Sequence, residues 1–326
     1  MLERENAMYG KYLRNIQIKL NNYRVHKLEK TFRKLNMDDR SWVEQACMED
    51  GSIAGHVNFL TMLIYQELYS YDAFIRCHDC VIKRPWTEDG VLYFQFPIGA
   101  PEKRKSAVIE MVKRYAPIYP DIVFLGASED GLHQLQKLYP DKIVAFENDR
   151  DSQNYILDVQ EQINLEGSSF ADRRNKIRRF NESYQWTWES VTEENIHECL
   201  KINSEWCDAY GDEVVAQRGR IEMDLIMKYY HDFDFRGELY RIDGVPVAFS
   251  MGCPFNKDTY INQMMKAKKE SRDITIATLH GFMSRNCAEY TYTNYTEDMG
   301  LPGLRKFKTM LRPKFLTDFY YITLHF

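Results

Sequence analysis

Glycine and proline are scarce in this sequence, with 16 and 10 residues among 326. Their scarcity excludes collagen-like chains and architectures dominated by flexible linkers. The longest apolar stretches, such as Asn58–Tyr65 and Val91–Ala100, are about half of the ~20 residues that a membrane-spanning helix needs. The first residues carry charges where a secretory signal would need an apolar core. We therefore predict a cytoplasmic protein without an integral membrane segment.

Several catalytic motifs are absent as well. The sequence contains no G-x-x-x-x-G-K-[ST], no G-x-G-x-x-G, no G-x-S-x-G and no H-E-x-x-H. P-loop nucleotide hydrolysis, Rossmann dehydrogenase chemistry, α/β-hydrolase chemistry and zincin proteolysis are therefore not supported. The seven cysteines are odd in number and irregularly spaced, which argues against a disulfide framework.

The run Cys77-His78-Asp79-Cys80 invites a metal or redox interpretation. A structural zinc site needs four ligands, and the sequence has no second C-x-x-C. A redox role would need a thioredoxin-like context, which is missing. We therefore interpret these cysteines as ordinary buried thiols and predict no metal site.

What is present is the composition of a globular protein. Hydrophobic residues make up 44% and aromatic residues 14%, which excludes a wholly disordered chain. A length of 326 residues suggests about two domains. The net charge is 43 minus 48, or -5, so a globally basic nucleic-acid binder is not indicated. Residues 1–34 are locally basic, and the solvated face of a helix accounts for them most simply.

Helical and strand patterns alternate along the chain, which indicates a mixed α/β class. We predict a basic helical extension over 1–30, a first domain over 31–158 and a second over 159–326, with the acidic segment 147–166 at the boundary. Helices are predicted in the first domain at 41–47, 59–69, 105–115 and 131–139, with strands at 91–96 and 122–125. The second domain is predicted to hold a helix through 173–180 capped by Ser169, further helices after 192 and at 221–230, 274–285 and 303–311, and strands at 186–191, 238–242, 246–252, 259–265, 289–295 and 315–324. Asp243-Gly244 predicts a hairpin.

The order of elements in the second half, β-α-α-β-β-β-α-β-α-β, is that of a GNAT (acetyltransferase-like) domain. Residues 154–158, 165–167 and 173–180 together resemble a signature of the phosphatidylglycerol lysyltransferase C-terminal domain family, "dYiY…L…L-G-kk…kR-n-i-n-F". Residues 297–306 resemble its second signature, "N-R-E-x-D-x-G-x-x-G-L-R-k-a-K", and Phe96-Pro97-Ile98-Gly99 resembles a shorter element. The resemblance runs from roughly 32 to 320, nearly the whole chain.

The resemblance implies a mixed α/β fold of two tandem GNAT-like domains and transfer of an acyl or aminoacyl group. The best-known members of the family move lysine from a charged tRNA to a lipid headgroup, and they carry an integral membrane domain, which we do not expect in this chain. Two departures weaken the prediction of catalysis. Asn294-Tyr295-Thr296 stands where the family has Asn-Arg-Glu, and the strand Tyr260–Met265, with Gln263, stands where it often has His-Ile-Glu-Lys-Ala.

The entry of the helix after Gly300 is the sharpest candidate for a carrier site. Gly300 and Gly303 allow close backbone approach, and free amides at a helix N-terminus attract anions. Arg305, Lys306 and Lys308 follow, so we predict that these residues bind the phosphates of a coenzyme or of a tRNA end. The alternative is a C-terminal helix with a solvated basic face.

A second basic cluster places five cations between Arg173 and Arg179. Like charges so close together repel, and a polyanion would relieve that repulsion. We predict that Arg174 and Arg178 contact the carrier. The alternative is that the cluster pairs with the acidic segment 147–166.

Acyl transfer to an amine requires a proton acceptor, oxyanion stabilisation and a proton donor to the leaving group. We predict that Glu297 and Asp298 bind or deprotonate the amine and that Tyr295 protonates the leaving group. A backbone amide of the strand Tyr260–Met265 would stabilise the oxyanion. The alternatives are helix N-terminal charge complementarity for the two acids and core packing for the tyrosine.

The sequence thus predicts an acyltransferase or aminoacyltransferase whose donor is an acyl-CoA or a charged tRNA. The acceptor would be a primary amine on a small molecule or peptide, and tRNA is the possible macromolecular partner. The alternative function is a catalytically degenerate module in which the basic groove binds an RNA or another polyanion. The substitutions at Thr296 and Gln263 favour this alternative.

Overall fold

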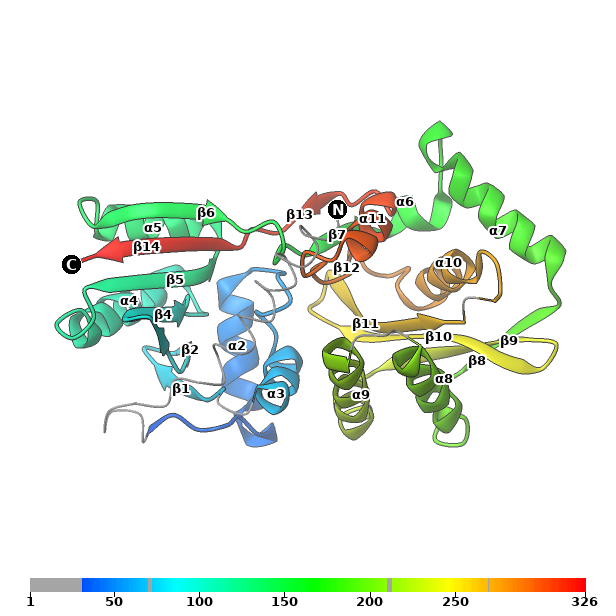
Figure 1. Cartoon of the computed structure of the whole chain (residues 1–326), viewed down its shortest axis with the longest axis horizontal. Coiled ribbons are helices and arrows are strands. Elements are labelled where there is room, and N and C mark those ends of the chain that lie inside the picture. Colours follow the sequence, from blue (N-terminus) through cyan, green and yellow to red (C-terminus); the bar gives the residue numbers. More distant parts are fainter. Residues whose placement is uncertain (1–30, 70–71, 210–212, 269) are drawn as a thin grey trace. The chain divides into compact units, whose positions relative to one another are not determined.

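The computed structural model describes residues 31–69, 72–209, 213–268 and 270–326 (Figure 1). The predicted basic extension, 1–30, lies outside the described residues. The chain divides into two compact units, and each is assembled from separate segments. Unit 1 contains the chain up to Asn154 together with Glu297–Met310 and Leu316–Phe326. Unit 2 contains Tyr155–Thr296 and Leu311–Phe315.

Unit 1 contains a five-stranded sheet, a small hairpin and the helices that accompany them. The sheet has the order β3-β4-β5-β14-β6, in which β4 and β5 are parallel and the other pairs are antiparallel. Its strands are β3 (Trp86–Glu88), β4 (Val91–Gln95), β5 (Asp121–Ala127), β6 (Ile143–Asn148) and β14 (Tyr320–His325). The hairpin is β1 (Phe74–Cys77) and β2 (Cys80–Lys83). The helices are a 3-10 helix (Met37–Asp39), α2 (Arg40–Asp50), α3 (Phe59–Leu68), α4 (Pro101–Tyr115), α5 (Glu129–Leu138) and α11 (Pro302–Met310).

The core of unit 1 forms where the apolar stripe of α4 meets the sheet. Val108 and Met111 of α4 belong to one buried cluster with Phe94 and Phe124, which lie on neighbouring strands. Spacing by three and four residues puts such side chains on one helix face, which is why this helix was predictable from sequence. It begins at Pro101, four residues before the predicted start, since proline is well suited to the first turn of a helix.

The C-terminal residues form two strands where one was predicted. The pattern over 315–324 predicts a single strand of the second domain. In the structure, β13 (Phe315–Leu316) belongs to the seven-stranded sheet, whereas β14 lies between β5 and β6 of unit 1 (Figure 1). The predicted division at 158 also differs, because the chain first passes between the units after Asn154. An alternating pattern reports that a strand is half-buried but not which sheet receives it.

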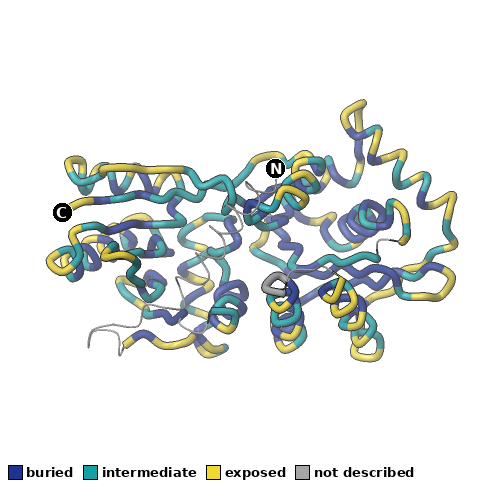
Figure 2. Tube along the Cα trace, in the orientation of Figure 1, coloured by how far each residue is buried: buried dark blue, intermediate teal, exposed yellow. Residues whose placement is uncertain are grey.

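Unit 2 is organised around a seven-stranded sheet with the order β13-β7-β12-β11-β10-β9-β8. Its further strands are β7 (Tyr155–Asp158), β8 (Trp186–Ser190), β9 (Arg236–Ile242), β10 (Val245–Pro254), β11 (Thr259–Ala267) and β12 (Tyr292–Asn294). The helices are α6 (Val159–Asn164), a 3-10 helix (Ser168–Phe170), α7 (Ala171–Ser183), α8 (Ile196–Asp208), α9 (Glu213–Lys228) and α10 (Ile274–Asn286). Helix α10 is buried along most of its length (Figure 2). The order β8-α8-α9-β9-β10-β11-α10-β12 matches the first eight predicted elements of the second half, and the ninth, α11, belongs to unit 1. The chain is a mixed α/β protein.

Two local predictions in unit 2 had different outcomes. The hairpin at Asp243-Gly244 is confirmed, because both residues have a positive φ, +50° and +78°, as a tight two-residue turn requires. The capping role of Ser169 is wrong. Ser169 lies inside the 3-10 helix, and α7 begins after Phe170 without a side-chain cap. Among the described residues, no helix is long and apolar enough to cross a membrane.

Candidate functional site

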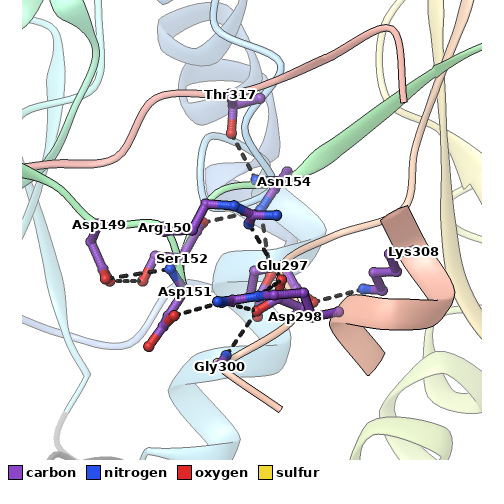
Figure 3. Close-up of polar contacts among 11 residues, drawn as sticks. Asp149, Arg150, Asp151, Ser152, Asn154, Glu297, Asp298, Gly300, Lys308 and Thr317 are labelled. Carbon is purple, nitrogen blue, oxygen red and sulfur yellow. Dashed lines mark hydrogen bonds and ion pairs between the residues drawn. The ribbon is translucent and has the colours of Figure 1, made fainter. Parts of the chain in front are cut away.

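The loop between β12 and α11 is fixed by one buried carboxylate (Figure 3). Asp298 is 0% exposed, and Arg305 of α11 donates two hydrogen bonds to its carboxylate, from Nε at 2.8 Å and from Nη2 at 2.7 Å. Nη1 of Arg150 lies 3.3 Å from the same carboxylate, and the amide of Gly300 donates to it at 2.9 Å. A buried carboxylate is tolerated only with such partners. Asp298 is therefore the anchor of this loop.

Arg305 connects this loop to the segment between β6 and β7. Its Nη2 also lies 2.6 Å from Oδ1 of Asp151, while the amide of Met299 donates to the carbonyl of Asp151 at 3.0 Å. The hydrogen bond to Asp298, followed by that to Asp151, raises the pKa of Arg305 above its usual value. Two parts of unit 1 that are far apart in sequence are thus held by a single guanidinium.

The structure brings Gly300 and Arg305 together, as predicted. The anion that they bind is the carboxylate of Asp298, however, and not an external phosphate. An external phosphate at the Gly300 amide would have to displace that carboxylate. Lys308 is 6% exposed, and its Nζ donates to the carbonyl of Glu297 at 2.7 Å. Gly303 and Lys306 are exposed on α11. Of the three predicted carrier-binding cations in this stretch, Lys306 is therefore the one that faces solvent.

Gly300 occupies a position that other residues fill only with strain. Its φ is +72°, and a Cβ placed on it would lie 2.7 Å from Oδ2 of Asp151. We expect Gly300→Ala to lower the free energy of unfolding by about 1–2 kcal/mol, the cost of a left-handed residue that carries a Cβ. Chemical denaturation monitored by circular dichroism would measure the change.

Gly303→Ala is the matched control for this substitution. A Cβ at Gly303 would meet nothing within 4 Å, and the residue lies in α11 without a positive φ. We expect no loss of stability, and a gain of up to about 1 kcal/mol because alanine favours helix. Equal effects of the two substitutions would show that Gly300 is not specifically required.

Glu297 presents a carboxylate that is only half-buried, next to the buried Asp298. Its Oε1 accepts from the Tyr65 hydroxyl of α3 at 3.3 Å, and its Oε2 accepts from Nδ2 of Asn154 at 3.5 Å. Asn154 is in turn fixed by Thr317, whose Oγ1 accepts from the Asn154 amide at 2.9 Å and whose own amide donates to the Asn154 carbonyl at 3.0 Å. These two hydrogen bonds to Glu297 are long, so a ligand can replace them at modest cost.

Sequence reasoning missed four members of this site. Tyr65, Arg150, Asp151 and Asn154 all contact the loop, and none was predicted to do so. Asn154 is the first residue of the first signature, and that position was a usable signal. The other three carry no local pattern, since their contacts with residues 297–305 span 148 to 232 positions of sequence.

Tyr295 belongs to unit 2, whereas Glu297 and Asp298 belong to unit 1. Its side chain is 5% exposed, and its amide donates to the carbonyl of Tyr155 at 2.9 Å. Burial raises the pKa of its hydroxyl, with a smaller contribution from Cys287. The phenol therefore keeps its proton at neutral pH, which is the state that proton donation requires. Its catalytic role stays a prediction.

The basic helix α7 divides its cations between internal contacts and solvent. Arg173 is buried, and its Nη1 donates to Oε1 of Gln162 and to the carbonyl of Leu311. Lys176 pairs with Asp172 at 2.8 Å, and Arg179 pairs with Asp273. These three cations are therefore occupied with contacts inside unit 2.

Arg174 and Arg178 are the exposed cations of α7. Arg174 donates to the carbonyls of Leu165 and Gly167. Both acceptors are neutral, so these two contacts do not neutralise the charge of Arg174. Several of the acids predicted as alternative partners pair with other cations. Asp151 pairs with Arg305 in unit 1, and Glu161 pairs with Lys314 in unit 2 at 2.6 Å.

Strand β11, predicted to hold the oxyanion site, is irregular after Ile261, within the predicted stretch Tyr260–Met265. Strand β11 pairs with β12 only from Thr259 to Ile261, and beyond that point it leaves its parallel neighbour. Its register with β10 also shifts, because Met251 opposes Met264 whereas Gly252 opposes Asn262. Gln263 is thus the extra residue of a bulge, and its Nε2 is buried without a partner among the described residues.

Comparison with known proteins gives a family match and several similar structures. The model of the family described as "Phosphatidylglycerol lysyltransferase, C-terminal" matches residues 55–323. No curated protein matches the chain at a significant level.

Three solved structures resemble the chain over most of its length. A conserved protein of unknown function from Bacteroides thetaiotaomicron is 23% identical with a TM-score of 0.78, covering 90% of this chain and 99% of its own. The C-terminal domain of a putative lysylphosphatidylglycerol synthetase from Agrobacterium fabrum is 14% identical with a TM-score of 0.59, covering 86% and 92%. The L-PGS structure from Bacillus licheniformis is 14% identical with a TM-score of 0.60, covering 89% and 92%. At these identities the likeness shows a shared fold.

Proposed function

The chain belongs to the phosphatidylglycerol lysyltransferase C-terminal family, and on that premise we propose that it transfers an acyl or aminoacyl group from a polyanionic carrier to a primary amine. The observation that carries the proposal is the half-buried carboxylate of Glu297 on a loop fixed by Asp298 and Arg305. Such a carboxylate can bind an ammonium group and then accept its proton. Asp298 serves to position it, because its own oxygens are committed to Arg305 and the Gly300 amide.

Of the two predicted carriers, the charged tRNA fits unit 2 better than an acyl-CoA. A coenzyme pyrophosphate favours a helix N-terminus with open amides. At the start of α10, Asp273 occupies the N-cap position and its carboxylate pairs with Arg179. This negative charge disfavours a pyrophosphate at that helix N-terminus. The exposed Arg174 and Arg178 instead suit a longer polyanion, in which successive phosphates meet separate cations.

The proposed step is direct attack of the amine on the carbonyl carbon of the carrier ester. The amine gives its proton to Glu297, the new amide bond forms, and the carbon–oxygen bond to the tRNA 3′ oxygen breaks. Tyr295 is the proposed proton donor to that oxygen. The amides of β11 where it leaves β12 are the proposed oxyanion donors.

A second function, polyanion binding without transfer, is supported by specific residues. Arg305 and Lys308, two of the predicted carrier-binding cations, are engaged inside unit 1. Thr296 and Gln263 stand where the related signatures carry charged groups. In this alternative the fold and the exposed cations of α7 bind RNA, and no group is transferred.

The two functions are separated by one assay. The full chain is incubated with tRNA charged with radiolabelled lysine, with small primary amines and amine-bearing peptides as acceptors, and with vesicles of phosphatidylglycerol in a parallel reaction. Transfer of the label to an amine supports the proposal, and transfer to the vesicles would change the acceptor. Binding of tRNA with no transfer to any acceptor would support the alternative function.

The role of α7 in carrier binding makes a separate prediction. Changing Arg174 and Arg178 to glutamate should weaken tRNA binding and reduce the slope of log affinity against log salt by up to about 2, close to one for each phosphate that is no longer neutralised. Fluorescence anisotropy across a salt series would measure both quantities.

Lys113→Glu with Lys137→Glu is the control, since it changes the charge equally at exposed positions of α4 and α5 in unit 1. We expect this control to keep the salt slope of the native chain. An equal loss in both variants would mean that net charge, rather than α7, governs the binding.

A further inference from the structure

The tip of the β1–β2 hairpin places three metal-ligand types together, away from the loop that holds Glu297. Cys77 ends β1, His78 is the first residue of the turn, and Glu110 projects from α4. One ligand atom from each residue, the thiol sulfur, an imidazole nitrogen and a carboxylate oxygen, lies within 4.8 Å of the other two. We propose that Cys77, His78 and Glu110 form a binding site for a borderline-soft divalent cation such as Zn²⁺.

The local backbone explains how adjacent residues can both face one point. His78 and Asp79 both have a positive φ, +50° and +57°, which is the geometry of a tight two-residue hairpin turn. This turn directs the His78 ring to α4, where Nε2 lies 2.8 Å from Oε2 of Glu110. Asp79 pairs instead with Arg76 at 2.7 Å.

The spacing is close to what coordination needs. Zinc binds sulfur, nitrogen and oxygen at about 2.0–2.3 Å, so ligand atoms in a tetrahedron lie ~3.3–3.8 Å apart. Small side-chain rotations would bring the three atoms from their present spacing to that value. Three protein ligands and one water are the usual set of an open zinc site. The mixture of sulfur, nitrogen and oxygen favours Zn²⁺ over Mg²⁺ or Ca²⁺.

The surroundings of the three ligands support a site that is reachable and oriented. The side chains of His78 and Glu110 are 44% and 40% exposed, so an ion can enter from solvent. Nη2 of Arg114 lies 3.0 Å from Oε1 of Glu110, which leaves Oε2 directed at His78. Such a contact to the outer oxygen fixes the orientation of a ligating carboxylate.

The second cysteine of the run is not part of this cluster. Cys80 is 0% exposed and belongs to the apolar core of unit 1. Its sulfur packs on Gly99, where a Cβ would lie only 2.7 Å from it. The sequence analysis predicted no metal site in this run, whereas the structure places His78 and Glu110, rather than Cys80, beside Cys77. None of the three proposed ligands has a role in the proposed transfer reaction, so this assignment is independent of that function.

Cobalt is the probe, because a thiolate bound to Co²⁺ gives a charge-transfer band in the near ultraviolet. The metal-free full chain is titrated with Co²⁺ at pH 7.5. We expect one equivalent to bind with this band, Zn²⁺ to abolish the band, and Mg²⁺ to leave it unchanged. A thiol that coordinates a metal ion is deprotonated, so binding should also release a proton. Calorimetry in buffers of different ionisation enthalpy would count that proton.

Four variants decide the assignment. Cys77→Ser should remove the band, and His78→Ala and Glu110→Gln should each weaken Co²⁺ binding by at least about 10-fold. Cys80→Ala is the matched control from the same hairpin and should keep both band and affinity, with its fold checked by circular dichroism. The proposal is overturned if Cys77→Ser keeps the band, if folded Cys80→Ala loses it, or if His78→Ala and Glu110→Gln bind Co²⁺ as the native chain does.

Discussion

Replacing Asp298 with alanine should lower the free energy of unfolding by about 3–5 kcal/mol, which is the usual cost of removing one partner from a buried ion pair. The substitution would remove the two hydrogen bonds from Arg305 to that carboxylate and would leave the Gly300 amide without this acceptor. Equilibrium denaturation in urea, monitored by tryptophan fluorescence and by circular dichroism, would measure the change.

Asp151→Ala provides the matched control, since Asp151 binds the same guanidinium but its side chain is 43% exposed. Exposed ion pairs contribute little, so we expect a loss below about 1 kcal/mol. If the two variants were equally stable, Asp298 would not be the anchor of the loop.

Replacing Glu297 with glutamine should reduce the rate of transfer by about 10²–10⁴-fold, the usual contribution of a general base. Glutamine keeps the shape of the side chain and can still accept a hydrogen bond from Tyr65, but it cannot take a proton from the amine. Single-turnover transfer from labelled lysyl-tRNA to the best acceptor would give the rate. We expect tRNA affinity and melting temperature to match those of the native chain.

Tyr65→Phe is the control for this variant, because it removes one hydrogen bond to Glu297 and leaves the carboxylate in place. We expect a loss of about 10-fold or less, as befits a group that only orients the carboxylate. Full activity of Glu297→Gln would exclude Glu297 as the base. A variant that also failed to bind tRNA would point instead to a role for Glu297 in carrier recognition.

Local patterns predicted much of the fold, and long-range pairing accounts for the differences. Asp243-Gly244 was readable because the backbone of a tight turn restricts the residues that can occupy it. The hairpin of β1 and β2 was missed, since its strands are short and its turn, His78-Asp79, lacks a glycine. The pattern over 315–324 showed extended chain, but the interruption that sends 320–325 to another sheet has no local signal.

The site was predicted only in part for a similar reason. The signature at 297–306 identified the correct loop, and Gly300 does need a positive φ. The same stretch was interpreted as a place for an external anion because Arg305 and Lys308 were counted as free charge. Their partners are buried or distant groups, such as Asp298 and Asp151, and a sequence does not reveal which charges neutralise each other inside the fold.

The position of β14 has a consequence for the biosynthesis of the protein. This strand is the hydrogen-bonded neighbour of both β5 and β6, yet about 170 residues separate Tyr320, its first residue, from Asn148 at the end of β6. Until β14 has been synthesised, β5 and β6 each expose an edge whose backbone N–H and C=O groups are unpaired. Such exposed edges can pair with other chains. We therefore expect nascent chains to depend on chaperones until residue 325 has emerged, and premature termination to yield aggregates rather than a working half.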